Sequence, residues 1–301
     1  MYIPSLVFIL VSSYTLMAGS FLQDEEAVPV GMILQTNGEV FVESESVRNA
    51  ARLGNLLNAG DQLIVSSGGA TFLFCPSQEK VTLSGGTSVE FSSDSVELVA
   101  GETPRTESVG RCALPRVSLG QASLERVGGL RARGHPAIVL YVGGTISQTH
   151  PLFQWEPIEG SDSYQLRLKN EMGIPVWEQS TTSTSVAYPE SRAALAEGKE
   201  YQWEVQALGE GEILAEQRAN FVMKLDPELP ATNSSDPVDQ LLRATTLENA
   251  GYFAESADVF RQLRETHPED IRFTRHLAWL YWNAGLIAAA NKERERLESQ
   301  E

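Results

Sequence analysis

The histidines and cysteines are the first residues to test for metal or nucleophilic chemistry. The histidines show neither H-x-H nor H-E-x-x-H spacing, and two cysteines are too few to complete a zinc module. Neither a G-x-x-x-x-G-K-[S/T] phosphate loop nor a G-x-S-x-G nucleophile motif occurs. We therefore expect no metal site, no cofactor and no catalytic residue, and we expect that the chain is not an enzyme. The four histidines are His135, His150, His267 and His276.

Acidic residues dominate the charge of the chain. It has 40 Asp and Glu against 23 Lys and Arg, which gives a formal net charge of −17. This excess repels phosphate, so we expect neither nucleic acid nor an anionic membrane surface as a partner. Acidic clusters such as Glu210-Gly-Glu212 lack the D-x-[DN]-x-[DN]-G spacing of a calcium loop and indicate a solvated surface.

One stripe of side chains has the chemistry of a binding surface. Arg272, Arg275, Trp279 and Trp282 are spaced i, i+3, i+7 and i+10 in a helical segment, and Asn283 adjoins them. Guanidinium groups beside indoles suit an extended peptide with a carboxylate and an apolar side chain. The alternative is that the two tryptophans pack against another domain or a second subunit, and the sequence leaves both open.

The amino-terminal segment predicts export. Residues 3–19 carry no charge, and Ala18 and Ser20 form an A-x-S site, so residues 1–20 are expected to be a signal peptide with a mature chain from Phe21. The alternatives are an uncleaved anchor facing the periplasm and a cytosolic protein. No second stretch is long and apolar enough to span a membrane. We expect a periplasmic or extracellular protein.

Export would decide whether the two cysteines are oxidised. In an oxidising compartment Cys75 and Cys112 are predicted to form a disulfide. The alternative is two free thiols, with Cys75 buried in a strand as a small hydrophobic residue.

The chain divides into three regions by the period of its apolar residues. Residues 30–122 show short alternating runs broken by Gly-rich turns, and a second β pattern covers residues 137–225. Residues 237–301 have a period near 3.6 and predict helices. Residues 123–136 and 226–236 are expected linkers. The predicted fold class is multidomain, with two all-β modules followed by an all-α helical pair.

The first region resembles the FecR domain, an extracytoplasmic β-module of bacterial envelope proteins. The resemblance rests on the run from Gly38 to Ser46 (GEVFVESES), on Gly60-Asp61 at the start of a strand, and on Leu98-Val-Ala-Gly101. It implies a β-domain outside the cytoplasm.

The second region resembles a fibronectin type III-like sandwich. Trp155 and Tyr164 lie in alternating runs, and Tyr201-Gln-Trp203 follows Leu195-Ala-Glu-Gly198 as in a tyrosine corner, where the Tyr hydroxyl bonds to the upstream backbone. We expect these four aromatic residues in the core.

The third region resembles a pair of tetratricopeptide repeats. Equivalent residues recur after 34 positions: Ala244 and Ala278, Gly251 and Gly285, Leu263 and Leu297. The expected helices are Val238–Ala250, Phe253–Thr266, Glu269–Asn283 and Leu286–Glu298. Two repeats bury too little apolar surface to form a stable core, so we expect the pair to pack against another domain, a second copy or a partner. The resemblance places the Arg–Trp stripe at ligand-facing positions.

Two functions are compatible with these patterns. The first is a non-catalytic cell-envelope scaffold or adaptor whose repeats bind an unidentified envelope protein or peptide, with possible homo-oligomerisation through the repeats. The alternative is an envelope module that binds cell-wall carbohydrate or a small ligand through the FecR-like β-domain.

Overall fold

The computed structural model describes residues 29–110, 112–115, 119, 137–226 and 236–300. The expected signal peptide 1–20 and the expected linker 123–136 lie outside the described residues, as does His135; of the second linker only Asp226 and Asp236 are described. None of the described helices is long and apolar enough to cross a membrane.

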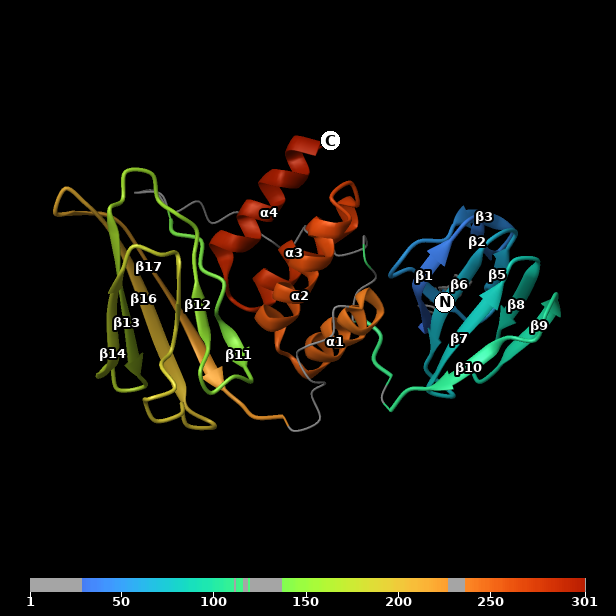
Figure 1. Cartoon of the computed structure of the whole chain (residues 1–301), viewed down its shortest axis with the longest axis horizontal. Helices are drawn as coiled ribbons and strands as arrows, with labels where there is room; N and C mark the ends of the chain where they lie inside the picture. The colour runs from blue at the N-terminus through green and yellow to red at the C-terminus, as the bar shows by residue number, and fades with distance from the viewer. Residues whose placement is uncertain (1–28, 111, 116–118, 120–136, 227–235, 301) are drawn as a thin grey trace, which may run out of the picture.

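The first β-domain is a sandwich of two five-stranded antiparallel sheets (Figure 1). One sheet has the order β10-β7-β6-β1-β4, with β10 at Arg105–Ser108, β7 at Glu79–Ser84, β6 at Gly69–Phe74, β1 at Pro29–Asn37 and β4 at Leu56–Asn58. The other has the order β3-β2-β5-β8-β9, with β3 at Val47–Ala50, β2 at Val40–Ser44, β5 at Gln62–Val65, β8 at Thr87–Phe91 and β9 at Val96–Ala100.

Strand β1 is buried on both faces. Ile33 packs with Phe72 in the core between the two sheets, whereas Met32, Leu34 and Leu73 belong to the core cluster that the helices share. Residues Val30 to Leu34 therefore form a nearly continuous apolar run instead of an alternating one. The first β-domain thus has an apolar outer face that must be covered by other elements.

The second β-domain is a two-sheet sandwich. Its large sheet has the order β11-β17-β16-β13-β14, in which only β11 and β17 pair in parallel; β12 and β15 form the small sheet. The strands are β11 (Gly144–Ile146), β12 (Leu152–Gln154), β13 (Ser163–Asn170), β14 (Pro175–Thr181), β15 (Ser185–Ala187), β16 (Glu200–Gly209) and β17 (Glu212–Met223).

The core of the second β-domain contains the four expected aromatic residues. Trp155, Tyr164, Tyr201 and Trp203 are all buried. The Tyr201 hydroxyl accepts a hydrogen bond of 2.9 Å from the Ala196 amide, five residues upstream, as expected for a tyrosine corner. The indole N–H of Trp203 donates to the Val142 carbonyl at 2.8 Å, so its one polar group is satisfied in the core.

Four helices follow: α1 (Pro237–Ala250), α2 (Phe253–Thr266), α3 (Ile271–Asn283) and α4 (Ile287–Gln300). Their bounds agree with the expected ones within two residues. Helix α3 begins later than expected because Asp270 caps it, accepting from the Arg272 amide at 3.1 Å. Gly251 and Gly285, 34 residues apart, follow α1 and α3 with φ of 88° and 74°, a left-handed conformation that favours glycine.

The helices lie between the two β-domains, although they follow both in sequence (Figure 1). A single cluster of buried side chains runs from Met32 in β1 through the helices to Phe221 in β17. The short repeat pair was expected to pack against another domain, a second copy or a partner. The structure shows the first of these, with the chain's own β-domains on both sides of the helices.

Candidate functional site

The predicted stripe lies on α3, and its residues differ in how far they are open to a partner. Trp279 is partly buried, edge-on to Phe253 at 5.7 Å between ring centroids and stacked on His276 at 5.6 Å. Trp282 is partly buried against the core, and Asn283 is exposed. Arg275 is partly buried. We call Arg275, Trp279, Trp282 and Asn283 the α3 surface.

Arg272 has a different role from the one expected. Its Nη2 donates to the carbonyl of Leu53 in the first β-domain at 2.9 Å, and it forms an ion pair with Asp270 at 2.6 Å. Burial acts to raise the pKa of Asp270, but the hydrogen bonds and charge of Arg272 outweigh this and lower it. Arg272 therefore ties α3 to the first β-domain instead of facing a partner, and for the α3 surface partner binding stays a prediction.

Asn249, at the end of α1, makes a second contact of this kind, which we did not expect from the sequence. Its side-chain amide donates to the Leu114 carbonyl, in the segment Cys112–Pro115 that follows the first β-domain. The same amide donates to the Thr245 carbonyl, one turn back, at 2.9 Å. Asn249 is 34 residues before Asn283, and that spacing was the signal available in the sequence.

The predicted disulfide between Cys75 and Cys112 is confirmed, with a Cα–Cα distance of 5.2 Å. The alternative of two free thiols is wrong. The bridge joins the end of β6 to the segment Cys112–Pro115, two residues before the carbonyl that Asn249 binds. The disulfide and Asn249 thus both hold this segment, the disulfide from the β-domain and Asn249 from α1.

A buried polar pair joins α1 to α3. Nε2 of His276 and Oε2 of Glu248 lie 2.9 Å apart, and both side chains are fully buried. The imidazole also packs edge-on against Phe260 at 4.6 Å. Because buried polar groups need partners, this pair constrains how the two helices pack.

The second β-domain holds α2 through a carboxylate. Glu255 accepts from the Ser147 amide at 2.6 Å and from its hydroxyl at 2.7 Å. Burial raises the pKa of Glu255, although both Ser147 hydrogen bonds act to lower it. The position also lies in the first turn of α2, where a negative charge is favoured.

Helices α2 and α4 contact the same domain through one polar chain. The Tyr141 hydroxyl donates to Glu156, which also forms an ion pair with Lys292 at 2.7 Å. The Arg261 guanidinium lies over the Tyr141 ring at 4.5 Å and donates to Gln154. Burial and the Glu156 carboxylate raise the pKa of Tyr141 well above its usual value. These contacts join the second β-domain to the helices and leave little freedom between them.

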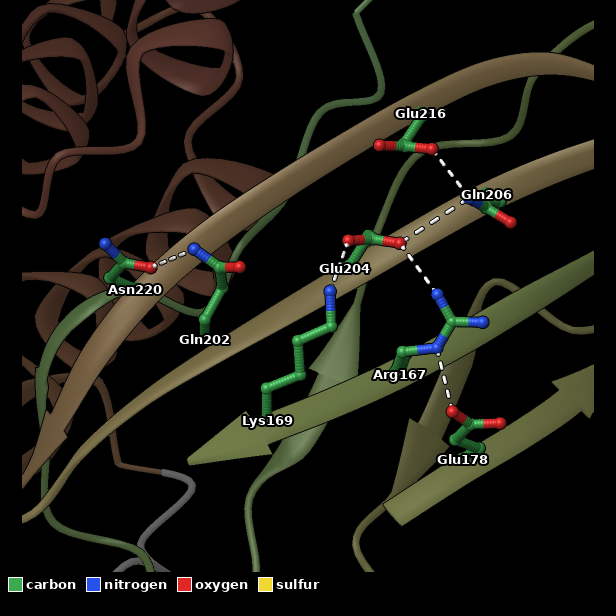
Figure 2. A network of polar contacts seen from close by, with 8 residues as sticks. All are labelled: Arg167, Lys169, Glu178, Gln202, Glu204, Gln206, Glu216 and Asn220. Carbon is green, nitrogen blue, oxygen red and sulfur yellow. Dashed lines mark hydrogen bonds and ion pairs between the residues drawn. The ribbon is translucent and has the colours of Figure 1, made fainter. Parts of the chain in front are cut away.

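The outer face of the large sheet carries a polar network, which Figure 2 shows. Glu204 on β16 is at its centre and accepts from Lys169 at 3.0 Å and from Arg167 at 3.3 Å. Arg167 also pairs with Glu178 at 2.8 Å, and Gln206 donates to Glu216 at 2.6 Å. Each charged group drawn in this network has a polar partner within it, so we assign the network to the stability of the sheet and not to a site.

A cavity of about 450 Å³ lies between the first β-domain and the helices. Arg272 is one of its lining residues; its Nη1 is buried and has no hydrogen-bond partner among the described residues. Its lining includes Gln35, Arg52, Asp236, His267, Asp270 and Arg272. Within the described part of the chain, no group of three His, Cys, Asp or Glu residues is placed to hold a metal ion.

Comparison with known proteins gives no family for the chain: no family model matches it, and no curated protein does. Fibronectin type III-like all-β folds are matched among solved structures. The fn3 domain of human collagen alpha-1(XX) matches at 16% identity and a TM-score of 0.26, covering 35% of this chain and all of that one. A two-domain fibronectin type III segment of chicken tenascin matches at 11% and 0.24, covering 65% and 95%.

A glycosidase also matches. An FMN-binding β-glucuronidase from Facaelibacterium prausnitzii L2-6 shows 11% identity and a TM-score of 0.27; the match covers 85% of this chain and 57% of that one. The prediction that the chain is not an enzyme is contradicted by such neighbours and is withdrawn. At these identities and TM-scores the likeness assigns no reaction to the chain. It therefore contributes nothing to the argument on function.

Proposed function

We propose that the chain is an exported scaffold of a bacterial cell envelope that binds a protein partner through its helices. In this proposal the first β-domain is a FecR-like module and the helices are two tetratricopeptide-like repeats. The observation that carries it is the α3 surface. Helix α3 is buried along most of its length, yet Trp279 and Trp282 are only partly covered and Asn283 is exposed. Partly exposed tryptophans are typical anchors of protein interfaces.

Export is supported by the disulfide, because such bridges persist in oxidising compartments. The proposal therefore places the mature protein in the periplasm or outside the cell, with residues 1–20 as its signal peptide. An uncleaved anchor would put the same domains on the same side of the membrane. The β-domains would then hold the helical pair in a fixed orientation for its partner.

Substitution of Trp282 by Ala is expected to weaken partner capture at least about tenfold, because interface tryptophans often contribute 2 kcal/mol or more. The measurement is crosslinking of the purified protein in envelope extracts, followed by titration of the captured chain. Trp279 is unsuitable for this test because it packs on Phe253. Glu295→Ala, at an exposed position on α4, is the matched control. Equal capture by parent and Trp282→Ala, with equal melting temperatures, would contradict the proposal.

The cavity beside Arg272 favours a second candidate, binding of a cell-wall fragment or another small ligand. Its volume of about 450 Å³ lies in the range of small-molecule sites. Arg52, His267 and Arg272 in its lining could pair with a carboxylate of such a ligand.

For this candidate we expect soluble muropeptides to raise the melting temperature of the parent protein. Gln35→Trp, which narrows the cavity from an exposed lining position, is expected to abolish the shift, whereas Gln35→Ala keeps it. An unchanged melting temperature of the parent with muropeptides in millimolar excess would exclude them as ligands of this cavity.

A further inference from the structure

The cavity between the first β-domain and the helices is lined by the first residues of two helices and by one loop. Asp236 and Asp270, which are 34 residues apart, cap α1 and α3 and accept from the amides of Val238 at 2.8 Å and Arg272 at 3.1 Å. Residues 51–53 of the first β-domain also line the cavity. A ligand bound there would therefore contact both the β-domain and the helices.

Two charged groups in the lining are open to a ligand. Asp270 already forms an ion pair with Arg272 at 2.6 Å, so these two charges offset each other. Arg52 and Glu269 are exposed, and neither side chain has a hydrogen bond or ion pair within the described part of the chain. The charge of Arg52 acts on Asp270, the residue after Glu269, so the guanidinium lies near the turn that carries Glu269. One free positive and one free negative group thus line the same cavity.

The backbone holds both groups in defined positions. The Arg52 amide donates to the side chain of Asn55 at 2.7 Å, and the Asn55 amide donates back to the Arg52 carbonyl at 3.0 Å. Glu269 lies in the turn before α3, where the Asp270 amide donates to the His267 carbonyl at 3.1 Å. The two charged side chains therefore start from ordered loops, which lowers the entropy lost when a ligand binds them.

The rest of the lining is suited to an ammonium group and a small apolar group. Nδ1 of His267 lies 3.1 Å from the Leu263 carbonyl, which can only accept, so in the neutral ring this nitrogen carries the proton and Nε2 is an acceptor. The apolar lining residues are Leu34, Ala51, Leu53, Pro237 and Val238.

We infer that the cavity binds a small zwitterion, an amino acid or short peptide with both ends free, whose carboxylate pairs with Arg52 and whose ammonium pairs with Glu269. Such a ligand forms an ion pair at each end, whereas a neutral or singly charged ligand forms one or none. The inference rests on the second proposed function, ligand binding in this cavity, and deepens it by naming the charge pattern of the ligand. Because Arg52 belongs to the β-domain and Glu269 to the helices, the ligand bridges the two.

The test uses alanine, alanyl-alanine and trialanine as probes, because they share one charge pattern and differ in length. We expect at least one of them, at millimolar concentration, to raise the melting temperature of the parent protein in a saturable way. Arg52→Gln and Glu269→Gln should each weaken this binding about fivefold. Arg105→Gln and Glu295→Gln, at exposed positions outside the lining, are the matched controls and should leave it unchanged.

Blocked forms of the best probe test which end pairs with which residue. The acetylated form lacks the ammonium and the amidated form lacks the carboxylate, so each should bind the parent about fivefold more weakly. The acetylated form should bind Glu269→Gln as well as it binds the parent, and the amidated form should do the same with Arg52→Gln. In each case the two changes remove the same ion pair.

The outcomes separate this inference from the proposed ligand site. If the blocked forms bind the parent as well as the free probe, or if either Arg52→Gln or Glu269→Gln binds the free probe like the parent, zwitterion recognition is overturned. A melting shift with muropeptides but with none of the three probes overturns the inference and keeps the ligand site. No shift with either overturns both.

Discussion

Reduction of the Cys75–Cys112 bridge is expected to lower the free energy of unfolding by about 4 kcal/mol. The bridge closes a loop of 37 residues, and opening it restores the chain entropy of that loop to the unfolded state. The midpoint of denaturant-induced unfolding should therefore shift to lower denaturant concentration when reductant is added. Because Cys112 lies two residues before Leu114, reduction should also loosen the contact with Asn249.

The control for this prediction is the double variant Cys75→Ala with Cys112→Ala. It should unfold at the denaturant concentration of the reduced parent and should not respond to reductant. The backbone amides in the last turn of α1, around Asn249, should exchange hydrogen faster in the reduced parent and in the double variant than in the oxidised parent. Coincident unfolding curves for the parent with and without reductant would contradict the expected stabilisation.

Replacement of Glu248 by Ala is expected to destabilise the protein by about 3 kcal/mol or more. The substitution leaves His276 fully buried without its carboxylate partner, and breaking a buried pair from one side has a cost of this size. The other ring nitrogen of His276, Nδ1, has no hydrogen-bond partner among the described residues, so no second hydrogen bond would compensate for the loss of Glu248. The measurement is the midpoint of thermal unfolding.

Two other variants test the cause. Glu248→Gln keeps a hydrogen-bonding group of the same size and should retain most of the stability. The double variant Glu248→Leu with His276→Phe removes both polar groups and should recover much of the loss, because an apolar pair avoids the desolvation of the original one. A loss for Glu248→Ala no larger than that for the exposed Glu295→Ala would show that the pair contributes little.

Local patterns in the sequence predicted the elements well. The 34-residue period gave the four helices within two residues, and the position of Tyr201 predicted its hydrogen bond to upstream backbone. Strand β1 was harder to identify, because burial on both faces removes the alternation by which strands are recognised.

The contacts between domains could not be predicted in this way. Arg272 binds Leu53, which is 219 residues away in the chain, and Glu255 binds Ser147, which is 108 residues away. No periodicity links residues so far apart in the sequence. The spacing of the residues on α3 therefore showed that they share one face of the helix, but not which other part of the protein covers that face. Arg272 was therefore expected to face a partner, although the chain's own β-domain occupies it.

The position of the helices between the β-domains sets the order in which the molecule can be completed. The two β-domains leave the ribosome before α1, yet their apolar faces at Met32 and Ile146 belong to the core that the helices complete. Until then, two folded sandwiches carry uncovered apolar surface on a single chain, a state that favours association with other chains.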